Sequence, residues 1–381
     1  MRVCRSSAAA FVALVAITPA CSAQGTTTAA MSGGELAGSL SMPAGFKAQY
    51  FAKELRGVRF MALGPDGAVY ATQPGAGRVV RLWDVSGDGL ADSVRVVIDG
   101  QRQPHGLAFH DGWLYIANTD AVVRVKLDRF GVAQGAPEKL ANITPGGGHW
   151  TRTVIFGADG KMYVAVGSSC NLCVEKDSDR AAVLRFDADG KNGRIFSRGL
   201  RNAVGIAVRP GSNEVWASQN ERDNIQPDHE NLPPEELNIL RDGGDFGWPY
   251  CYSVKAQPMP NPEYHDADRC AKTLPAALDL PPHTAPLGLS FLSNATLFPA
   301  DYRGDLLVAL HGSWNRTVPV GAKVIRVHIE SGKPVSQDDF ITGWQDASGK
   351  RWGRPVDVLV NKDGSVLISD DSSGSIYRIS H

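Results

Sequence analysis

The chain is 381 residues long, with a formal net charge of −1 at pH 7, 43% hydrophobic residues, 41 glycines and 23 prolines. The near-neutral charge excludes the basic excess expected of a nucleic-acid-binding protein. The composition also excludes a disordered chain, and it indicates a domain that has a core and many tight turns.

The N-terminus has the layout of a secretory signal peptide. Arg2 and Arg5 precede an apolar stretch at 8–17, and small residues follow at 20–23. The apolar stretch is too short to span a bilayer, which needs about 20 residues. We therefore expect residues 1–23 to direct export.

The remainder is expected to consist of a flexible linker, 24–42, and one folded domain, 43–381. The linker is polar and rich in small residues. Export predicts a periplasmic or secreted protein. Contact with a membrane is expected only if Cys21 is lipidated, which would make the protein a lipoprotein.

Within the domain, an apolar strand-like run leads into a turn six times. The runs are FMALGPDG (60–67), GLAFHDG (106–112), TVIFGADG (153–160), GIAVRPG (205–211), GLSFLSN (288–294) and VDVLVNKDG (356–364). A second run and usually a third follow each one, with alternating polarity and many β-branched residues. These repeats predict an all-β fold, a six-bladed β-propeller.

The last repeat supplies only three strands. We expect the run at 46–52 to complete the final blade, because closure by a strand from the other terminus removes an exposed sheet edge. The longest insertion lies between Gly211 and Gly304. Long loops in compact domains usually have a function, so this insertion is expected to form one wall of a pocket.

An acidic loop follows the first repeat. Asp84, Asp88 and Asp92 have the spacing of calcium ligands, with Gly89 at the sharp turn, but Arg95 stands where such a loop ends in a bidentate glutamate. The loop is either a structural Ca²⁺ site or a polar turn between blades.

Four cysteines lie in the domain, and an even number in an exported chain favours two disulfides. We pair Cys170 with Cys173 and Cys251 with Cys270, since each pair lies within one loop, although three pairings are possible. A redox CxxC or a zinc site is the alternative. Val174 follows the CxxC segment, which excludes covalent c-type haem attachment.

Polar residues precede several of the six runs at matching positions. When the runs are aligned on their last apolar residue, His149 and Arg201 fall at the same position before it. Asn202 and Arg354 fall together at the following position. Rotational repeats bring equivalent positions together around an axis. A base beside cations would suit oxidation of an alcohol with an anionic cofactor. Taken singly, each residue could instead cap a strand or lie on the surface.

The chain resembles the soluble sugar dehydrogenases that depend on pyrroloquinoline quinone (PQQ), the glucose and sorbosone dehydrogenase family, and most of all the sorbosone branch. The segments that carry this resemblance are GGGHWTRTVIFGADGKMYVAVGSSCN (146–171), RGLRNAVGIAV (198–208), ELNILRDGGDFGWPYC (236–251), HGSWNR (311–316) and RPVDVLV (354–360).

The resemblance implies roles for the polar residues. His149 matches the family's catalytic base, which takes the hydroxyl proton while hydride passes to the quinone. Arg201 and Asn202 match the pair that contacts the cofactor near the reacting quinone oxygen, so Arg201 is also a candidate catalytic residue. Gln101 and Arg354 match further cofactor contacts.

The resemblance also implies a Ca²⁺ ion that polarises a quinone carbonyl, bound by the backbone carbonyl oxygens of Asn220 and Glu221. Two family cations are missing. Arg316 is assigned the role of a lysine that holds a cofactor carboxylate, and Val356 replaces the second arginine of the last blade.

These observations predict a periplasmic quinoprotein that oxidises a sugar or a sugar-derived aldehyde or alcohol, with PQQ and Ca²⁺ as cofactors. An external acceptor, a cytochrome or the quinone pool, is expected to take the electrons. The alternatives are a calcium-dependent lactone hydrolase and a non-catalytic binding propeller. The lactonase would surround its metal with acidic ligands, whereas the residues in phase here are mostly cationic or imidazole.

Overall fold

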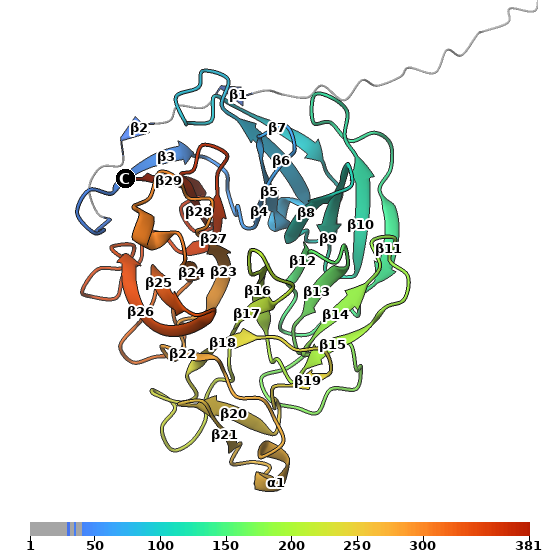
Figure 1. Ribbon diagram of the computed structural model, residues 1–381, viewed down its shortest axis with the longest axis vertical. Coiled ribbons are helices and arrows are strands. Elements are labelled where there is room, and N and C mark those ends of the chain that lie inside the picture. The colour runs from blue at the N-terminus through green and yellow to red at the C-terminus, as the bar shows by residue number, and fades with distance from the viewer. Residues whose placement is uncertain (1–28, 31–33, 36–39) are drawn as a thin grey trace, which may run out of the picture.

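The computed structural model describes residues 29–30, 34–35 and 40–381. Within these residues, antiparallel sheets form six blades around an axis (Figure 1). The innermost strands, which define blades 1 to 6, are β4 (Met61–Leu63), β8 (Gly106–His110), β12 (Arg152–Phe156), β16 (Ala203–Val208), β23 (Pro286–Phe291) and β27 (Pro355–Val360). Each contacts the next and β27 contacts β4. The six sequence runs are therefore the inner strands, and the six-bladed propeller is confirmed.

The outer strands follow in order from the axis. Blade 1 continues with β5 (Val69–Gln73), β6 (Arg78–Trp83), β7 (Ser93–Ile98) and β1 (Ala29–Ala30), and blade 2 with β9 (Trp113–Ala117), β10 (Ala121–Lys126) and β11 (Glu138–Asn142). Blade 3 continues with β13 (Met162–Val166), β14 (Ala182–Phe186), β15 (Arg194–Arg198) and β19 (Gly244–Asp245), and blade 4 with β17 (Val215–Gln219), β18 (Glu235–Ile239) and β22 (Leu278–Leu280). Blade 5 continues with β24 (Leu306–Leu310), β25 (Lys323–Glu330) and β26 (Lys333–Ile341), and blade 6 with β28 (Val366–Asp370), β29 (Ser375–Ser380), β3 (Lys47–Ala52) and β2 (Gly34–Glu35).

Blade 6 joins the two ends of the described chain. β3 pairs with β29, and Tyr50 lies opposite Tyr377, so the blue and red strands are neighbours in Figure 1. The prediction that the run at 46–52 completes the last blade is confirmed. Of the segment expected to be a linker, the short strands β1 and β2 pair with β7 and β3. The expected signal peptide, 1–23, lies outside the described residues.

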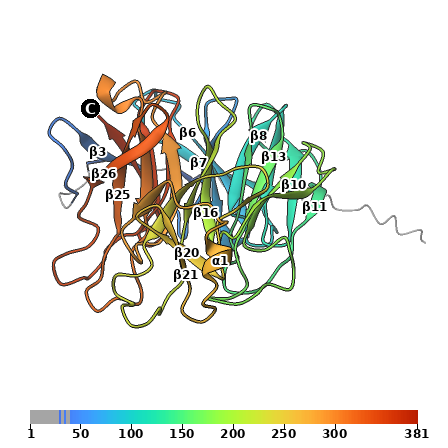
Figure 2. The same cartoon turned by 60° about the horizontal axis from the view of Figure 1, so that its bottom comes forward.

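The apolar core lies between blades rather than along the axis alone. Six clusters of buried residues each join two neighbouring blades, and the one between blades 6 and 1 includes Phe51, Val69, Leu82 and Leu367. Figure 2 shows the blades standing side by side. Every residue of the second strands β13 and β24 is buried. Strands covered on both faces read as continuous apolar runs, so the expected alternation does not hold for them.

Glycines let neighbouring inner strands approach one another. A Cβ atom on Gly205 would lie 2.0 Å from the carbonyl oxygen of Leu287, and one on Gly288 would lie 2.0 Å from Oδ1 of Asp357. These distances leave no room for a side chain. A Cβ atom on Gly106, in blade 2, would lie 2.6 Å from the Cα atom of Thr153 in blade 3.

The axis carries an apolar cluster beside the polar site. Phe60, Val204, Leu287 and Val356 come from blades 1, 4, 5 and 6 and are all buried. Val204 and Val356 each follow a predicted site residue by two positions. The valine that replaces a family arginine in the last blade therefore packs against its counterparts around the axis.

Both predicted disulfides are confirmed. Cys170 and Cys173 close a tight loop between β13 and β14. Cys251 and Cys270 join β20 (Cys251–Val254), which pairs with β21 (Gln257–Pro260), to the short helix α1 (Ala267–Cys270). This unit projects from the rim beside blade 4 (Figure 1).

The remaining short elements are the 3₁₀ turns Pro74–Ala76 and Ala300–Tyr302. Among the described residues, no helix has the length and apolar character that a membrane crossing requires.

Candidate active site

His149 lies on a loop that leads into β12, and buried arginines hold that loop in place. Arg152 is fully buried and donates from NH1 to the carbonyl oxygen of His149 (2.9 Å) and from NH2 to that of Thr144 (2.8 Å). NH2 of Arg180 donates to the carbonyl oxygens of Pro145 and Gly146, each at 2.6 Å. The loop backbone is thus fixed by guanidinium groups rather than by a strand ladder.

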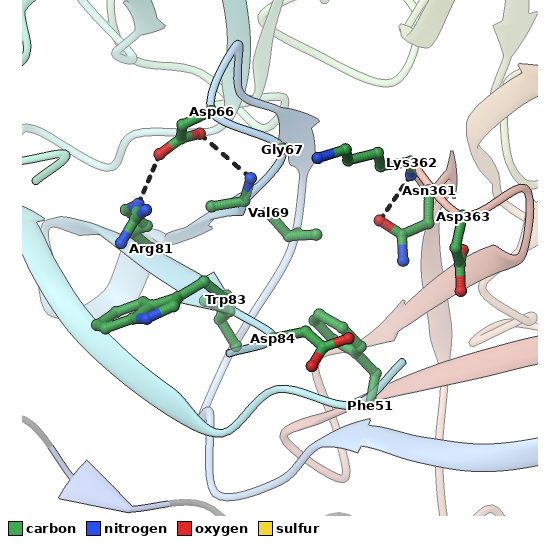
Figure 3. A pocket seen from close by; sticks show the side chains of 12 residues that line it. Phe51, Asp66, Gly67, Val69, Arg81, Trp83, Asp84, Asn361, Lys362 and Asp363 are labelled. Carbon is green, nitrogen blue, oxygen red and sulfur yellow. Dashed lines mark hydrogen bonds and ion pairs between the residues drawn. The ribbon is translucent and has the colours of Figure 1, made fainter. Parts of the chain in front are cut away.

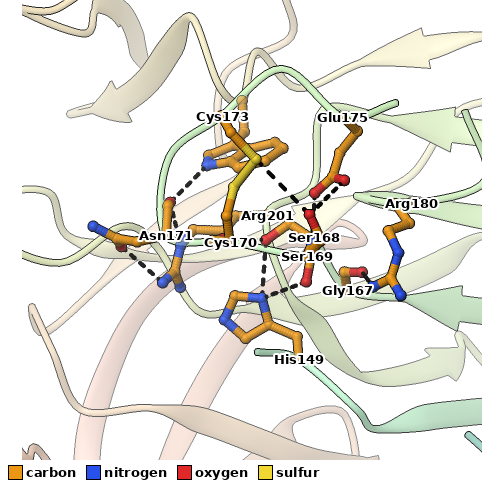
Figure 4. The surroundings of a disulfide bond; sticks show 11 residues. His149, Gly167, Ser168, Ser169, Cys170, Asn171, Cys173, Glu175, Arg180 and Arg201 are labelled. Atoms are coloured by element: carbon orange, nitrogen blue, oxygen red, sulfur yellow. Dashed lines mark hydrogen bonds between the residues drawn. A yellow bond between two sulfur atoms is a disulfide. The ribbon is translucent and has the colours of Figure 1, made fainter. Parts of the chain in front are cut away.

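The hydrogen bonds of the His149 ring define its tautomer. Nδ1 lies 2.9 Å from both the carbonyl oxygen and Oγ of Ser168 (Figure 4). A carbonyl oxygen only accepts, and the Ser168 hydroxyl donates to the carbonyl oxygen of Cys170 at 2.7 Å. The proton of the neutral ring therefore lies on Nδ1, and Nε2 carries the basic lone pair.

Burial keeps His149 neutral. It lowers the pKa of His149 to about 4, and the charge of Arg201 acts in the same direction. Because this pKa is far below neutrality, the imidazole is unprotonated at pH 7 and can accept a proton at Nε2.

Arg201 is held on three sides. Its side chain is 5% exposed. Nε donates to the carbonyl oxygen of Asn171 (3.0 Å), NH2 to Oδ1 of the same residue (2.9 Å), and NH1 to the carbonyl oxygen of Asn220 (3.2 Å). NH2 also lies 3.4 Å from Oδ2 of Asp223. Burial lowers the pKa of Arg201, and the charge of Asp223 opposes that shift.

Asp223 connects blades 4 and 5. Asn315 donates to its Oδ1 at 2.8 Å, and Nδ1 of His283 lies 3.7 Å from the same oxygen. Burial acts to lower the pKa of His283, but the nearby acids Asp223 and Glu235 together raise it. Asp223 therefore lies between two potential cations, Arg201 and His283.

Asn202 lies beside His149. An ideal Cβ atom on Gly167 would lie 2.4 Å from Oδ1 of Asn202 and 2.6 Å from Cβ of His149, so the missing side chain lets the two residues pack together. Oδ1 of Asn202 is buried and has no hydrogen-bond partner among the described residues. Such an atom is costly unless a bound molecule satisfies it.

Arg354 belongs to a second polar cluster, on blades 5, 6 and 1. It donates from Nε to the carbonyl oxygen of His311 and from NH2 to that of Gly312, both at 2.9 Å. The His311 ring contacts Oδ1 of Asp371 at 2.9 Å, and Arg59 forms an ion pair with Oδ2. Burial would raise the pKa of Asp371, but His311 and Arg59 lower it to about 2.

The two clusters meet through Trp150. The Arg59 guanidinium lies 5.7 Å from the centre of the Trp150 ring, and Trp150 directly follows His149. His149, Arg201 and Arg354 all precede inner strands and so lie at the same end of the blades. The structure brings His149, Arg201 and Asn202 together. Arg354 belongs to the neighbouring cluster, whose Arg59 contacts Trp150.

Two other residues with predicted cofactor roles have local partners. Gln101 donates to the carbonyl oxygen of Asp99 (3.2 Å) and accepts from Asn118 (3.0 Å). Nε of Arg316 lies 3.4 Å from a carboxylate oxygen of Glu230. Their cofactor roles stay predictions.

The expected calcium ligands lie in an acidic region. The carbonyl oxygen of Asn220 is turned toward Arg201, whereas the side chain of Glu221 is buried close to Glu235 and Glu236. The backbone N–H of Glu221 donates to Glu235 at 2.6 Å. Burial raises the pKa of Glu235 to about 8 and also raises that of Glu236.

The carboxylates of the acidic loop accept hydrogen bonds from the loop's own backbone. Asp84 accepts from the N–H groups of Gly87 and Gly89, and Asp92 from those of Val85 and Ser86. These bonds are those of a polar turn. The Ca²⁺ alternative stays a prediction.

A pocket of about 380 Å³ lies between blades 1 and 6 (Figure 3). Gly67 and Lys362 line it, and both follow the ends of inner strands, whereas His149 and Arg354 precede them. This pocket therefore lies at the opposite end of the blades from the candidate active site.

Several residues of the site were not predicted. His311 and Asp371 are the first residues after the second strands of their blades, as Asn220 and Gly167 are in theirs. Comparing the first residue after the second strand of every blade, as was done for the residues before the inner strands, would have identified His311 and Asp371. Arg59 directly precedes the first inner run, so the signal used for the other polar residues before inner strands would have found it. The sequence carries no such signal for Asn171, Asp223 or Asn315.

Comparisons with known proteins agree with this architecture. The chain is 29% identical over 368 residues to a PQQ-dependent pyranose dehydrogenase of Coprinopsis cinerea, covering 80% of this chain and 49% of the relative. It thus spans about half the length of that relative. An uncharacterized protein of Borreliella burgdorferi is 27% identical, with 91% of this chain and 92% of the relative covered.

Solved structures show the same fold. The holo form of the PQQ domain of the Coprinopsis pyranose dehydrogenase superposes with a TM-score of 0.79 and 25% identity, covering 91% of this chain and 98% of that chain. The calcium structure of a Trichoderma reesei family AA12 enzyme superposes with a TM-score of 0.79 at 19% identity, covering 90% and 96%.

The propeller is thus that of the PQQ-dependent sugar dehydrogenases, as the sequence resemblance implied; the sorbosone branch stays a prediction. A family model described as TrAA12-like matches residues 40–381. The chain belongs to the TrAA12-like family.

Proposed function

We propose that this protein is a PQQ-dependent dehydrogenase that oxidises a sugar or a sugar-derived aldehyde or alcohol, of the aldose or sorbosone type. The observation that carries the proposal is the neutral His149, whose Nε2 carries a lone pair beside the buried cation Arg201. Support comes from the 29% identity to a PQQ-dependent pyranose dehydrogenase.

The side chains present fit PQQ, an anionic ortho-quinone with carboxylate groups. Arg201, Arg354 and Arg59 supply positive charge, and guanidinium groups bind carboxylates well. The buried amide of Asn202 has an unpartnered oxygen, so it is available to a bound molecule. When bound, PQQ supplies a quinone that accepts hydride.

His149 would take the substrate hydroxyl proton at Nε2. Its Nδ1–H bond to the carbonyl oxygen of Ser168 holds the ring in the required tautomer and stabilises the imidazolium after proton transfer. Arg201 would stabilise negative charge that develops close by, because its guanidinium is fixed before the reaction. Asn202, Gln101, Arg316 and Arg354 are the remaining proposed cofactor contacts.

We assign Ca²⁺ to the carbonyl oxygens of Asn220 and Glu221. Calcium prefers oxygen ligands, including backbone carbonyl oxygens, and the carboxylate of Asp223 lies close to this position, where it contacts Arg201 at 3.4 Å. Bound there, the ion would act as a Lewis acid.

An exported location accompanies this function. Both disulfides suit an oxidising compartment such as the periplasm. The electrons would pass to an external acceptor, a cytochrome or the quinone pool.

The test is reconstitution. The full chain, purified without cofactor, is mixed with PQQ and Ca²⁺ and assayed for dye reduction with aldoses, sorbosone and simple alcohols. We expect activity with at least one sugar, dependent on both additions. Inactivity of folded, PQQ-saturated protein across the panel would contradict the proposal, and lactone hydrolysis without PQQ would favour the hydrolase instead.

A further inference from the structure

One loop contacts most of the segments that build the candidate active site. This loop, residues 168–175, is called the cysteine loop here. Ser168 bonds to the His149 ring, and its backbone N–H donates to the carbonyl oxygen of Arg201 at 2.7 Å. Ser169 accepts from Gly148, next to His149, at 2.9 Å. The cysteine loop therefore lies between the proposed base and the proposed cofactor cation.

Asn171 makes most of the loop's contacts with Arg201, as Figure 4 shows, and it also contacts Asp223. Its carbonyl oxygen and Oδ1 accept from two different nitrogens of Arg201, at 3.0 and 2.9 Å. Oδ1 also accepts from the backbone N–H of Asp223 (2.8 Å), and Nδ2 donates to the Asp223 carbonyl oxygen (3.0 Å). One residue thus holds a guanidinium group and the backbone of its carboxylate partner.

A disulfide and hydrogen bonds hold the cysteine loop, and one of these bonds runs from Nε1 of the buried Trp248 to the carbonyl oxygen of Asn171 (3.3 Å). The Cys170–Cys173 disulfide brackets Asn171. The backbone N–H and the hydroxyl of Ser169 donate to the carboxylate of Glu175, at 2.5 and 2.8 Å. Val174 is 57% exposed, so it provides little packing. Without the disulfide, the chain around Asn171 would have more conformational freedom.

We propose that the cysteine loop is a positioning device for the active site, and that Asn171 is its positioning residue. Asn171 orients Arg201 and Asp223, and the Cys170–Cys173 disulfide keeps Asn171 in place. The consequence for PQQ affinity rests on the proposed function, whereas the effect on Arg201 does not.

The other disulfide provides a matched control. Cys251 and Cys270 are each 1% exposed and join β20 to α1 at the rim. A general loss of stability should follow removal of either disulfide. Only removal of the Cys170–Cys173 bond should make the Arg201 guanidinium more mobile and more accessible.

The experiment compares the full-length wild type with Asn171→Ala, Asn171→Asp, the double variant Cys170→Ser/Cys173→Ser and the control double variant Cys251→Ser/Cys270→Ser. Phenylglyoxal modification of the cofactor-free proteins, read by peptide mass spectrometry, reports the accessibility of Arg201. Arg152, fully buried, and Arg194, with a side chain 42% exposed, serve as internal standards. An absorbance titration then gives the affinity for PQQ in the presence of Ca²⁺.

We expect Asn171→Ala and Cys170→Ser/Cys173→Ser to increase labelling of Arg201 and to weaken PQQ binding by about tenfold or more, as loss of charge-assisted hydrogen bonds would. Asn171→Asp keeps the acceptor for Arg201, so labelling of Arg201 should stay close to wild type. It loses the Nδ2 donor to Asp223 and adds a negative charge, so PQQ binding should weaken without release of Arg201. The Cys251→Ser/Cys270→Ser control should change neither readout.

Unchanged labelling of Arg201 in both Asn171→Ala and Cys170→Ser/Cys173→Ser would overturn the inference. An equal increase in Arg201 labelling in the control Cys251→Ser/Cys270→Ser would overturn it as well. If the wild type fails to bind PQQ, the proposed function fails instead, and the labelling alone still decides whether the cysteine loop positions Arg201.

Discussion

At the scale of single residues, the protonation state of His149 is set by its surroundings. Its Nδ1 partner is a backbone carbonyl oxygen, so the tautomer does not depend on a titrating side chain. Burial and Arg201 lower its pKa to about 4, which keeps the base ready at neutral pH.

Replacement of His149 tests its role as the base. His149→Ala should reduce kcat by about 10²–10⁴-fold, the usual contribution of general base catalysis. PQQ affinity should change far less, because the arginines remain. Steady-state kinetics with dye reduction and a PQQ titration would measure both. An active His149→Ala variant would assign the proton to another group.

The pH dependence of the reaction follows from the same pKa. Only unprotonated His149 can act as the base, and its pKa is lowered to about 4. The value of kcat/KM should therefore stay level from neutral pH down to about pH 5 and fall below about pH 4. A fall centred near 6.5, the ordinary value for histidine, would contradict this environment.

Asp371 should stabilise the fold. Asp371→Ala leaves the largely buried guanidinium of Arg59 without its partner, which should lower the free energy of unfolding by about 1–3 kcal/mol. Because the folded-state pKa of Asp371 is lowered to about 2, its contribution should be complete above its ordinary pKa and be lost as the pH falls toward 2. Urea unfolding at several pH values would measure both. Equal stability of Asp371→Ala and wild type at pH 7 would contradict the prediction.

At this scale the sequence predicted what the repeats encode. His149, Arg201, Asn202 and Arg354 share positions relative to the inner strands, so their common end could be inferred. Asn171 and Asp223 belong to insertions without a repeat, and only the folded chain shows what they contact.

At the scale of elements, close contact between inner strands demands glycine at particular positions. Gly205→Ala places a methyl group against the carbonyl oxygen of Leu287 and should destabilise the fold by about 1–3 kcal/mol or more. Gly75→Ala is the control, because nothing lies within 4 Å of its Cβ position. Denaturant unfolding would compare them. Equal stability of the two variants would contradict the packing of blade 4 against blade 5.

The strand types show where pattern analysis succeeds and where it fails. The inner runs end in clear turns, so all six were identified, and β3 was expected at blade 6 because that blade lacked a strand. The second strands, such as β13 and β24, are buried on both faces, and their polarity depends on neighbouring blades that local patterns do not describe.

At the scale of the whole molecule, ring closure makes the site. His149, Arg201 and Arg354 come from loops that enter blades 3, 4 and 6, and only the circular arrangement brings them to one end. The pairing of β3 with β29 completes that circle. The number of blades and the closing strand could be predicted from the sequence, but the link through Trp150 and Arg59 could not, because it depends on side-chain packing between blades.

The most direct test of this account is a titration of the folded full-length protein with PQQ in the presence of Ca²⁺, followed by absorbance. We predict saturation at one PQQ per chain, and weaker binding for both Arg201→Ala and Arg354→Ala although these residues belong to different blades. A wild-type protein that binds no PQQ, or that binds it equally well after both substitutions, would contradict the account.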